Sequence, residues 1–346
     1  MNTEPWNPKF IKYSSIEGNK ASIIKNIQKA EIANCDWIVC EKVHGANFSF
    51  ITNGTEIVCS RRKGLLQPDE RFYNFQAVRE KYREAVIQCW EVVRGRGLIE
   101  ADASLTIYGE LFGGIYRHPS IVNDNDSGNE PPVQTEVQYC PHRDFLAFDI
   151  LSEDVGYFDM DVMWSVLEEA GVPYIKPLMT GCTFEEALAF NPKFQTTVPA
   201  LFGLPDIKCN FAEGVVIRPI KTLRVTRIRV ILKLKYGGFM EKKPKTAKKI
   251  QKEDNSMAPV NVVLEQLKGF VNENRLVSVL SKEGELTEEN KSEIMKLLVD
   301  DAMEDYKKEE DLWKTFDDLT EREQITVTKM LRRAAMEVIR EHLKAE

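Results

Sequence analysis

A lysine follows an apolar run near residue 40, in the sequence EKVHG (41–45). The run over 36–42 predicts a strand that ends at Lys42, and Gly45 allows a tight turn into a second strand over 47–52. An amine at such a strand end can act as a nucleophile once it has lost its proton. The pKa of an ordinary lysine, ~10.4, lies about three units too high for that, and neighbouring cations can lower it. Taken alone, the pattern is more typical of a structural lysine on a loop.

Polar and mostly ionic side chains also stand at the ends of later predicted strands. In chain order they are Arg62, Glu110, Phe148 with Asp149, Glu213 with Gly214, and Lys233 with Lys235. The last two project from one face of their strand because side chains alternate, and the other face carries Val230, Leu232 and Leu234. Two ammonium groups on one face suit a triphosphate and the charge that develops on it. An amphipathic surface strand is the alternative.

The distribution of charge is uneven along the 346 residues, whose net charge is −7. Taken as a whole, this value argues weakly against a polyanionic partner. Residues 251–346 hold 15 Lys/Arg and 23 Asp/Glu, whereas residues 218–249 hold 12 Lys/Arg and one acid, Glu241. A basic strip of this kind is typical of a phosphate or nucleic-acid surface, and equally of a solvated face.

The elements that must position these residues are strands and helices in the first ~240 residues, followed by helices alone. Alternating or β-branched runs predict strands over 36–42, 47–52, 56–62, 104–111, 145–151, 213–219 and 228–235. A helical apolar period covers 71–95, 160–171 and 183–190, and turn formers over 123–132 predict a surface loop. After a polar segment, three further stretches repeat apolar residues at helical spacing. We expect domains over 1–240 and 260–346, joined by a basic linker over 241–259.

The cysteines and histidines show neither a disulfide framework nor a zinc site. Seven cysteines are scattered without a C-x-x-C pattern, and four histidines are not at zinc-ligand spacing. No apolar run approaches the ~18 residues of a membrane span, and the N-terminal residues predict no secretory signal. We therefore expect an intracellular protein with free thiols and no membrane segment.

Five ordered motifs give the chain a specific resemblance over about residues 11–245. KVHGANF (42–48), YGELFGGIYRHPS (108–120), VQYCPHRDFLAFDI (137–150), FAEGVVIRP (211–219) and VILKLKY (230–236) are similar to those of the RNA ligase 2 family. This family belongs to the covalent nucleotidyltransferases, and the second and third motifs look especially like its kinetoplastid RNA-editing branch. The resemblance implies an α+β fold, an ATP-grasp-like nucleotidyltransferase domain of antiparallel sheets flanked by helices, with a small all-α C-terminal domain.

The resemblance also implies a role for each motif residue. Lys42 would carry AMP covalently, and the nucleotide-binding residues would be Glu41, Val43, Asn47, Arg62, Glu110, Phe148, Lys233 and Lys235. Within this set, Glu110 would hold the ribose hydroxyls and Arg62 the ribose or a phosphate. Phe148 would stack on adenine, an aromatic face being what a purine needs, unless it is an ordinary core residue.

Four further residues complete the implied site. Glu213 would bind Mg²⁺ or Mn²⁺, because such ions prefer hard oxygen ligands. His44, Asp149 and Arg218 would contact the RNA phosphate or support their neighbours, although several family members have lysine where Arg218 stands.

The implied activity is ATP-dependent joining of RNA 3′-hydroxyl and 5′-phosphate ends, with a nick in duplex RNA as the expected substrate. A DNA ligase or a capping guanylyltransferase is a competing reading, but both usually carry K-x-D-G and a barrel domain after the fifth motif. A non-catalytic RNA-binding module would need the basic strip without Lys42, Glu110 and Glu213. The helical C-terminal domain would recognise duplex RNA, or else serve as a stabilising or dimerising appendage.

Overall fold

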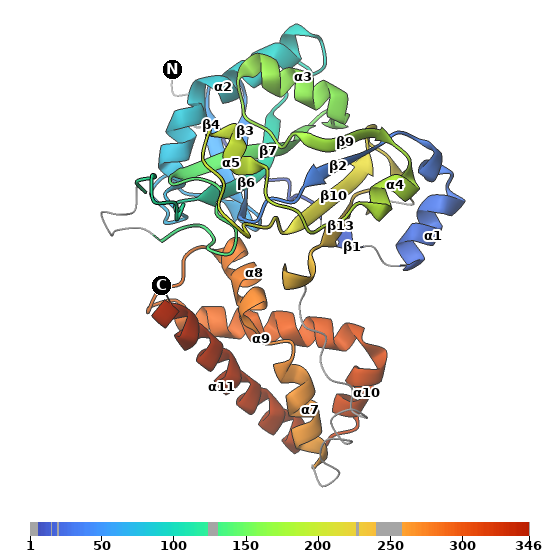
Figure 1. Cartoon of the computed structure of the whole chain (residues 1–346), viewed down its shortest axis with the longest axis vertical. Helices are drawn as coiled ribbons and strands as arrows, with labels where there is room; N and C mark the ends of the chain where they lie inside the picture. The colour runs from blue at the N-terminus through green and yellow to red at the C-terminus, as the bar shows by residue number, and fades with distance from the viewer. Residues whose placement is uncertain are drawn as a thin grey trace. The chain divides into compact units, whose positions relative to one another are not determined.

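The computed structural model describes residues 6–14, 16–18, 21–123, 131–225, 228–239 and 258–345 (Figure 1). The chain forms two compact units, Met1–Gly238 and Phe239–Glu346. Most of the predicted basic linker over 241–259 and most of the predicted loop over 123–132 lie outside the described residues. Among the described residues, no helix is both long and apolar enough to span a membrane.

A six-stranded antiparallel sheet forms one half of the N-terminal unit. In spatial order its strands are β5 (Gly64–Leu65), β4 (Ile57–Arg61), β3 (Ala46–Thr52), β6 (Leu105–Gly113), β7 (Arg143–Ser152) and β8 (Gly156–Tyr157). The predicted strands over 47–52, 56–62, 104–111 and 145–151 are therefore confirmed, with small shifts at their ends. The sheet sets β3 against β6, and in this register Asn47 faces Glu110.

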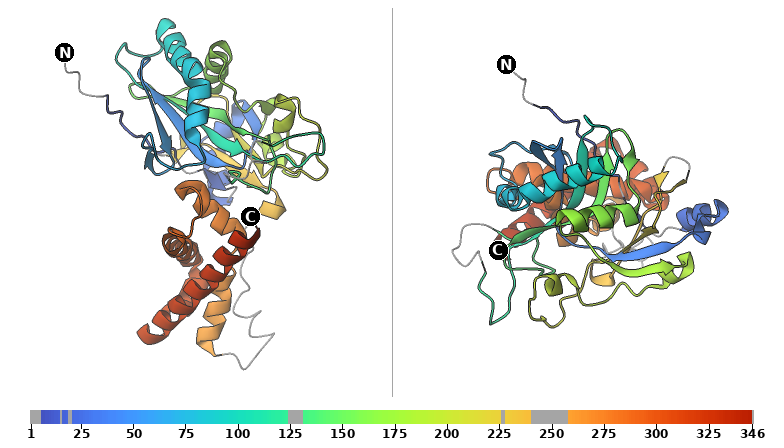
Figure 2. Two further views of the ribbon diagram at one scale, coloured as in Figure 1. Left: turned by 90° about the vertical axis from the view of Figure 1, so that its left-hand side faces the viewer. Right: turned by 90° about the horizontal axis from the view of Figure 1, so that it is seen from above.

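Two amphipathic helices cover one face of this sheet. Helix α2 (Phe75–Gly95) turns an apolar stripe toward β3, β4, β6 and β7, with Val86 and Cys89 fully buried. Helix α3 (Met160–Ala170) lies beside α2, as both views in Figure 2 show, and buries Met163 and Leu167. The helices predicted over 71–95 and 160–171 are thus confirmed, and they form the layer that covers this face of the sheet.

A second, five-stranded sheet contains the strand that leads to Lys42. Its order is β1 (Glu17–Gly18), β13 (Leu232–Lys235), β10 (Gly214–Pro219), β2 (Trp37–Glu41) and β9 (Pro177–Cys182). All its pairs are antiparallel except β1 with β13. The run predicted as one strand over 228–235 is divided into β12 (Ile228–Arg229), which pairs with β11 (Arg224–Val225), and β13.

The two faces of the five-stranded sheet have different chemistry. One face packs Trp37, Val215, Leu232 and Leu234 against α1 (Ala21–Lys29) and α4 (Phe184–Ala189). The burial of β13 alternates, so that its two leucines are buried and its two lysines are partly exposed. This alternation confirms the expected separation of Lys233 and Lys235 from the apolar face.

The remaining short helices among the described residues are η1 (Ile32–Asn34), α5 (Val198–Leu201) and η3 (Gly237–Phe239).

An aromatic cluster joins the opposite face of that sheet to the six-stranded sheet. Tyr13 from the N-terminal segment packs with Tyr108 of β6 and Ile231, and partly buried Phe148 and Val216 lie against them. The N-terminal segment therefore contributes to the layer between the two sheets, although its described residues form only the two-residue strand β1.

The C-terminal unit is helical throughout its described residues. Its helices are α7 (Pro259–Lys268), α8 (Glu273–Glu283), α9 (Lys291–Lys308), α10 (Glu310–Asp317) and α11 (Glu321–Ala345). They enclose a core that includes Leu267, Leu276, Leu298, Leu331 and Ile339. The prediction of a helical domain is confirmed. The barrel that a DNA ligase or capping enzyme would carry is not formed by the described residues.

A buried arginine joins three segments of this helical unit. Arg275 on α8 is fully buried, and its guanidinium donates to the carbonyl oxygen of Phe270 at 2.7 Å. It also pairs with the carboxylates of Asp301 and Asp305 on α9. These bonds fix the turn before α8 to the middle of α9, because a buried guanidinium must keep its partners.

Replacing Arg275 with alanine should therefore destabilise the helical unit by about 3 kcal/mol. The loss arises because the carbonyl group and the two carboxylates lose their donor. Denaturant unfolding of the full chain, followed by circular dichroism, measures the effect. Arg332→Ala, on the exposed side of α11, is the control and should change the free energy of unfolding by less than about 0.5 kcal/mol. Equal stability of both variants would contradict this role of Arg275.

Candidate active site

Lys42 lies directly beyond the end of β2, where the sheet aligns it with the beginning of β10. Its backbone N–H donates to the carbonyl oxygen of Gly214 at 2.9 Å. Its Nζ lies 2.5 Å from Oε2 of Glu213. Two residues that are 171 positions apart in the chain therefore meet because β2 and β10 are neighbouring strands.

Glu213 is the centre of the site, with only 2% of its side chain exposed. Its Oε1 lies 3.0 Å from Nζ of Lys235, and its Oε2 lies 3.4 Å from Nδ1 of His44. Burial opposes the charged form of Glu213, but Lys42, His44 and Lys235 outweigh it and hold the pKa of this carboxyl well below its usual value. The carboxylate is thus a permanent negative charge that three basic side chains share.

Two glycines, Gly214 and Gly45, allow close approach of the backbone segments that meet at this site. A Cβ at Gly214 would lie 2.0 Å from the carbonyl oxygen of Leu234, and this residue has a φ of +148°. A Cβ at Gly45 would lie 2.2 Å from the carbonyl oxygen of Leu111 on β6. Gly45 is therefore required for close packing of its backbone against β6, a different reason from the tight turn expected from the sequence.

The protonation of Lys42 differs from the sequence expectation. Burial lowers the pKa of Lys42, but Glu213 and Glu110 outweigh both burial and the cation Arg62, so the pKa is raised. The cation Arg62 does lower the pKa of Lys42, as expected from the sequence, but the direct partner of the lysine is a carboxylate and the net shift is upward. The lysine with the depressed pKa is Lys233, in which burial and the charges of Lys42 and Lys235 lower the value to about 8.

Glu110 and Asn47 lie opposite each other on β6 and β3, beside the Lys42 turn. The backbone N–H of Gly45 donates to Oε1 of Glu110 at 3.1 Å. Burial, assisted by the negative charge of Glu213, raises the pKa of Glu110 to about 7. Arg62, which follows β4, is close enough to influence the pKa of both Lys42 and Lys233. The structure therefore brings these three predicted residues to the same centre.

His44 lies between two carboxylates, one of which the sequence did not indicate. Its Nε2 is 3.5 Å from Oε2 of Glu136, and its backbone N–H donates to the Tyr139 hydroxyl at 2.8 Å. Burial lowers the pKa of His44, but Glu136 and Glu213 outweigh it and raise the value to about 9. His44 is therefore a cation at neutral pH that links the segment over 131–140 to the site.

Glu41 and Val43 flank Lys42 but direct their side chains away from it. The Glu41 carboxylate accepts hydrogen bonds from the backbone N–H and hydroxyl of Thr197, at 2.8 and 2.7 Å, and from the Thr196 hydroxyl. Val43 is buried. The Glu41 carboxylate is thus used to hold the segment around Thr197, so that a contact of Glu41 with a nucleotide would come from its backbone.

Asp149 and Arg218 belong to a separate buried network. Asp149 accepts from Arg218 at 3.0 Å, from Arg229 at 2.6 and 2.9 Å, and from the Tyr13 hydroxyl at 2.8 Å. The guanidinium of Arg229 also stacks on Tyr157, 3.7 Å from its ring centre. Burial opposes ionisation of Asp149, but the two arginines hold the pKa of its carboxyl below the usual value. This network supports the sheets, and it contacts Phe148 through the ring of Tyr13.

Phe148 is partly exposed and lies beside this network. Its ring packs edge-on against Tyr13, with ring centres 4.9 Å apart. It is therefore neither a fully buried core residue nor a free surface residue. One part of its ring is fixed by Tyr13, and the remainder can accept a planar ligand.

Several residues of the site carried no clear sequence signal. Glu136, Tyr139, Tyr13, Arg229 and Thr197 each act through a partner at least 80 residues away in the chain. Tyr13 lies in the N-terminal part of the region with the family resemblance, and Arg229 lies in the basic strip. Those two could have been proposed from the sequence, whereas Glu136 and Thr197 could not.

The family model described as RNA ligase matches residues 36–235, which contain every site residue that the sequence predicted. The chain belongs to the RNA ligase family. A second model, described as the T4 RNA ligase 2 C-terminal domain, matches residues 253–337. The membership in the RNA ligase 2 family that the motifs predicted is therefore confirmed. The match to the helical unit also argues against the alternative interpretations as a DNA ligase or a capping enzyme.

Curated proteins similar to this RNA ligase family member include two from a trypanosome. RNA-editing ligase 1 of Trypanosoma brucei brucei, a mitochondrial protein, is 28% identical over 359 residues, covering 87% of this chain and 76% of the relative. RNA-editing ligase 2, also mitochondrial, is 27% identical over 350 residues, covering 87% and 83%. Both names agree with the resemblance to the editing branch.

Among solved structures, Naegleria gruberi RNA ligases are similar to this chain. An apo mutant form matches with a TM-score of 0.45 and 17% identity, covering 67% of this chain and 58% of that one. A mutant form with ATP and manganese matches with a TM-score of 0.44 and 17% identity, covering 68% and 59%. The chain thus spans less than two thirds of the Naegleria proteins.

Replacing Asp149 with asparagine should destabilise the N-terminal unit by about 3–5 kcal/mol, because two buried guanidinium groups lose their counter-charge. The folded carboxyl has a depressed pKa, so its stabilisation is present above the unfolded value of ~3.9 and is lost as pH falls below it. Urea unfolding at neutral pH and near pH ~3 measures both effects.

The control for this substitution is Asp102→Asn at an exposed turn, with an expected change below about 0.5 kcal/mol. The difference between wild type and Asp149→Asn should shrink toward low pH. A difference that stays constant across this range would contradict the assignment.

The imidazole of His44 should titrate with a midpoint near pH 9. Since its folded pKa is raised, the stabilisation it gives is complete below the unfolded value of ~6.5 and is lost as pH rises through the folded one. Glu136→Gln should move the midpoint downward, because one of the two carboxylates is neutralised. Histidine side-chain NMR, assigned with His44→Asn, measures it. An unshifted midpoint in Glu136→Gln would show that the contact with Glu136 does not set the charge of His44.

Proposed function

We propose that this chain is an ATP-dependent RNA ligase that seals nicks in duplex RNA through a lysyl-AMP intermediate on Lys42. The observation that carries the proposal is the convergence of Lys42, Glu213 and Lys235 at the facing ends of β2, β10 and β13. Lys42 is the nucleophile, and the other basic residues bind the negatively charged phosphates. Membership in the RNA ligase family supports the RNA substrate.

The nucleotide would lie between the Lys42 turn and β7. Phe148, whose ring is partly exposed, would stack on the adenine, and the backbone of Glu41 and Val43 would contact the edge of the base. Glu110 and Asn47, opposite each other on β6 and β3, would bind the ribose.

The phosphates would then reach the cationic part of the site. Lys233 and Lys235 share one face of β13, and Arg62 lies near Lys42 on the opposite sheet. Lys233, Lys235 and Arg62 together form a cluster of positive charge beside Lys42 that stabilises the charge on the reacting phosphates. Lys233, with its lowered pKa, gains most from an anionic ligand, since phosphate favours its charged form.

The donor set of the site fits a divalent cation. Glu213 is a buried carboxylate and Glu110 a partly buried one, and they are close enough that the charge of Glu213 raises the pKa of Glu110. Oxygen donors of this kind are the ligands that Mg²⁺ and Mn²⁺ prefer. Such an ion, when bound, would neutralise phosphate charge and favour the leaving group.

The reaction follows from the position of Lys42. The amine must first lose its proton and its ion pair with Glu213, and the freed Nζ lone pair then attacks the α-phosphorus of ATP. A nitrogen–phosphorus bond forms, and the bond to pyrophosphate breaks. An oxygen of the RNA 5′-phosphate next attacks the phosphorus of AMP, and the nitrogen–phosphorus bond breaks and releases Lys42. A 3′-hydroxyl then attacks the RNA 5′-phosphorus, so that a phosphodiester bond forms while the bond to AMP breaks and the hydroxyl proton passes to solvent. Arg62, His44 and Arg218 are our candidates for contact with, or support of, the RNA phosphate.

The helical unit is our candidate for recognition of duplex RNA. Its match to the T4 RNA ligase 2 C-terminal family supports this assignment. Duplex RNA is recognised through A-form shape and 2′-hydroxyl groups, so RNA nicks should be preferred over DNA nicks. Exposed arginines on α11, such as Arg332, Arg333 and Arg340, provide local positive charge in an otherwise acidic unit.

Incubation with ATP labelled at the α-phosphate and Mg²⁺ should label wild-type protein on a denaturing gel. Lys42→Ala should abolish the label, because the nucleophile is removed. Lys235→Ala should reduce the rate of labelling by about 10²-fold, a typical loss for one transition-state charge. Lys25→Ala, an exposed lysine on α1, is the matched control and should label normally.

Two outcomes would contradict the proposal. One is the absence of label from folded protein that was first freed of bound AMP by pyrophosphate. The other is label from GTP in place of ATP, which would indicate a capping reaction. A comparison of nicked duplex RNA, nicked duplex DNA and single-stranded RNA then tests the preferred substrate.

A further inference from the structure

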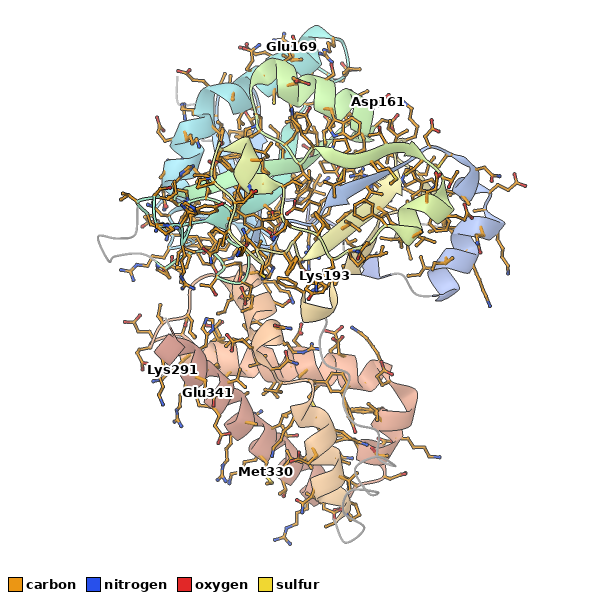
Figure 3. All side chains as sticks on the ribbon, viewed as in Figure 1. Asp161, Glu169, Lys193, Lys291, Met330 and Glu341 are labelled. Carbon is orange, nitrogen blue, oxygen red and sulfur yellow. The ribbon has the colours of Figure 1, made fainter. Side chains whose placement is uncertain are left out.

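A second group of side chains lies next to the catalytic centre and takes no part in the chemistry described above. The rings of Phe211 and Tyr236 lie 5.8 Å apart, centre to centre. The Nζ of Lys193 is 5.0 Å from the centre of the Phe211 ring and 5.2 Å from that of Tyr236. Both rings are partly exposed, and Lys193 lies at the surface of the N-terminal unit (Figure 3). We call these three residues the aromatic platform.

The backbone ties the aromatic platform to the reacting groups. Phe211 precedes Glu213 by two residues, and Tyr236 directly follows Lys235. The N–H of Tyr236 donates to the carbonyl oxygen of Glu213 at 2.9 Å. The two rings therefore sit within two residues of the two side chains that define the active centre.

Lys193 is fixed to the same place by its own segment. The next residue, Phe194, accepts from the N–H of Ala212 at 3.0 Å, and Gln195 pairs with Phe211 in an isolated bridge. Further along, Thr197 holds Glu41 beside Lys42. A ligand that contacts the aromatic platform is thereby set at a defined distance from Lys42.

The chemistry of the aromatic platform suits one nucleotide. Partly exposed aromatic rings accept a stacked base without regard to its identity, because every base has a flat π face. A lysine on a flexible stem can leave the rings and bond to a backbone phosphate. An internal cation–π contact that only stabilises the loop is the competing explanation.

On the basis of the proposed ligase function, we propose that Lys193, Phe211 and Tyr236 bind a nucleotide next to the RNA end being joined. Because the two ring planes are tilted by 56°, one ring stacks on the base and the other packs against its edge, while Lys193 bonds to the phosphate. The aromatic platform holds the strand so that the terminal phosphate reaches Arg62 and the lysines of β13. It is an RNA contact of the N-terminal unit itself, separate from any contact of the helical unit.

The test separates RNA binding from the reaction with ATP. Phe211→Leu and Tyr236→Leu should each weaken binding of 5′-adenylylated nicked RNA about fivefold or more. The loss of affinity should exceed any loss in the rate of Lys42 labelling. Phe211→Tyr and Tyr236→Phe keep a ring and should retain wild-type affinity, which a purely structural defect of the leucine variants would not explain.

A fluorescent base reports stacking directly. With 2-aminopurine placed in turn at each of the nucleotides flanking the nick, wild-type protein should quench one position, and the leucine variants should not. The controls come from another lysine over a ring, Lys176 at 5.8 Å from the centre of Tyr174. Lys176→Ala and Tyr174→Leu should bind RNA normally.

The outcomes distinguish this inference from the proposed function. If wild-type protein is labelled by ATP and seals RNA, while the leucine variants bind and quench as wild type does, the aromatic platform is not an RNA contact. If wild-type protein fails to be labelled at all, the proposed ligase chemistry is at fault. Lys193→Ala should reduce the salt dependence of RNA binding by about one phosphate contact, and an unchanged slope would remove Lys193 from the aromatic platform.

Discussion

A buried carboxylate needs positive charge close to it, and the active centre of this chain is organised around that need. Glu213 is almost completely buried and draws Lys42, His44 and Lys235 to its two oxygens. An unpaired carboxylate in this position would cost several kcal/mol. The strand order that brings β2, β10 and β13 together satisfies this requirement and also assembles the reactive lysine, its neighbours and the aromatic platform.

Asp149 is another buried carboxylate of the chain, and its comparison with Glu213 is informative. Asp149 is paired with two arginines, whose guanidinium groups keep their protons at any ordinary pH. Glu213 is paired with lysines and a histidine, which can give up a proton. The first arrangement therefore holds the sheets together permanently, and the second can be rearranged when a phosphate or a metal ion enters. The type of basic residue therefore distinguishes the two carboxylates. Arginines keep Asp149 permanently paired, whereas the partners of Glu213 can change their protonation.

Much of the fold and part of the site could be predicted from the sequence, for identifiable physical reasons. The alternation of side chains along a strand predicted correctly that Lys233 and Lys235 lie on the face opposite the apolar residues. The order of the motifs predicted correctly that Lys42, Glu110 and Glu213 lie close together. The net direction of the pKa shift of Lys42 could not be predicted, because strand pairing brings its closest partner, Glu213, from 171 residues away. Glu136 could not be found at all, since a single acid in a turn-rich segment has no periodic signal. The side-chain direction of Glu41 likewise depends on threonines that meet it only in the folded state.

The Asp149 network also has a consequence for synthesis of the chain. Its donors are Tyr13, 136 residues earlier, and Arg218 and Arg229, 69 and 80 residues later. At ~5–20 residues per second on the ribosome, the carboxylate waits about 4 to 16 seconds for its last guanidinium. During that time β6 and β7 can pair, but the layer between the sheets holds an ion without its counter-charge. The six-stranded sheet is therefore expected to form first during translation, and the N-terminal unit to close only when β12 and β13 have emerged.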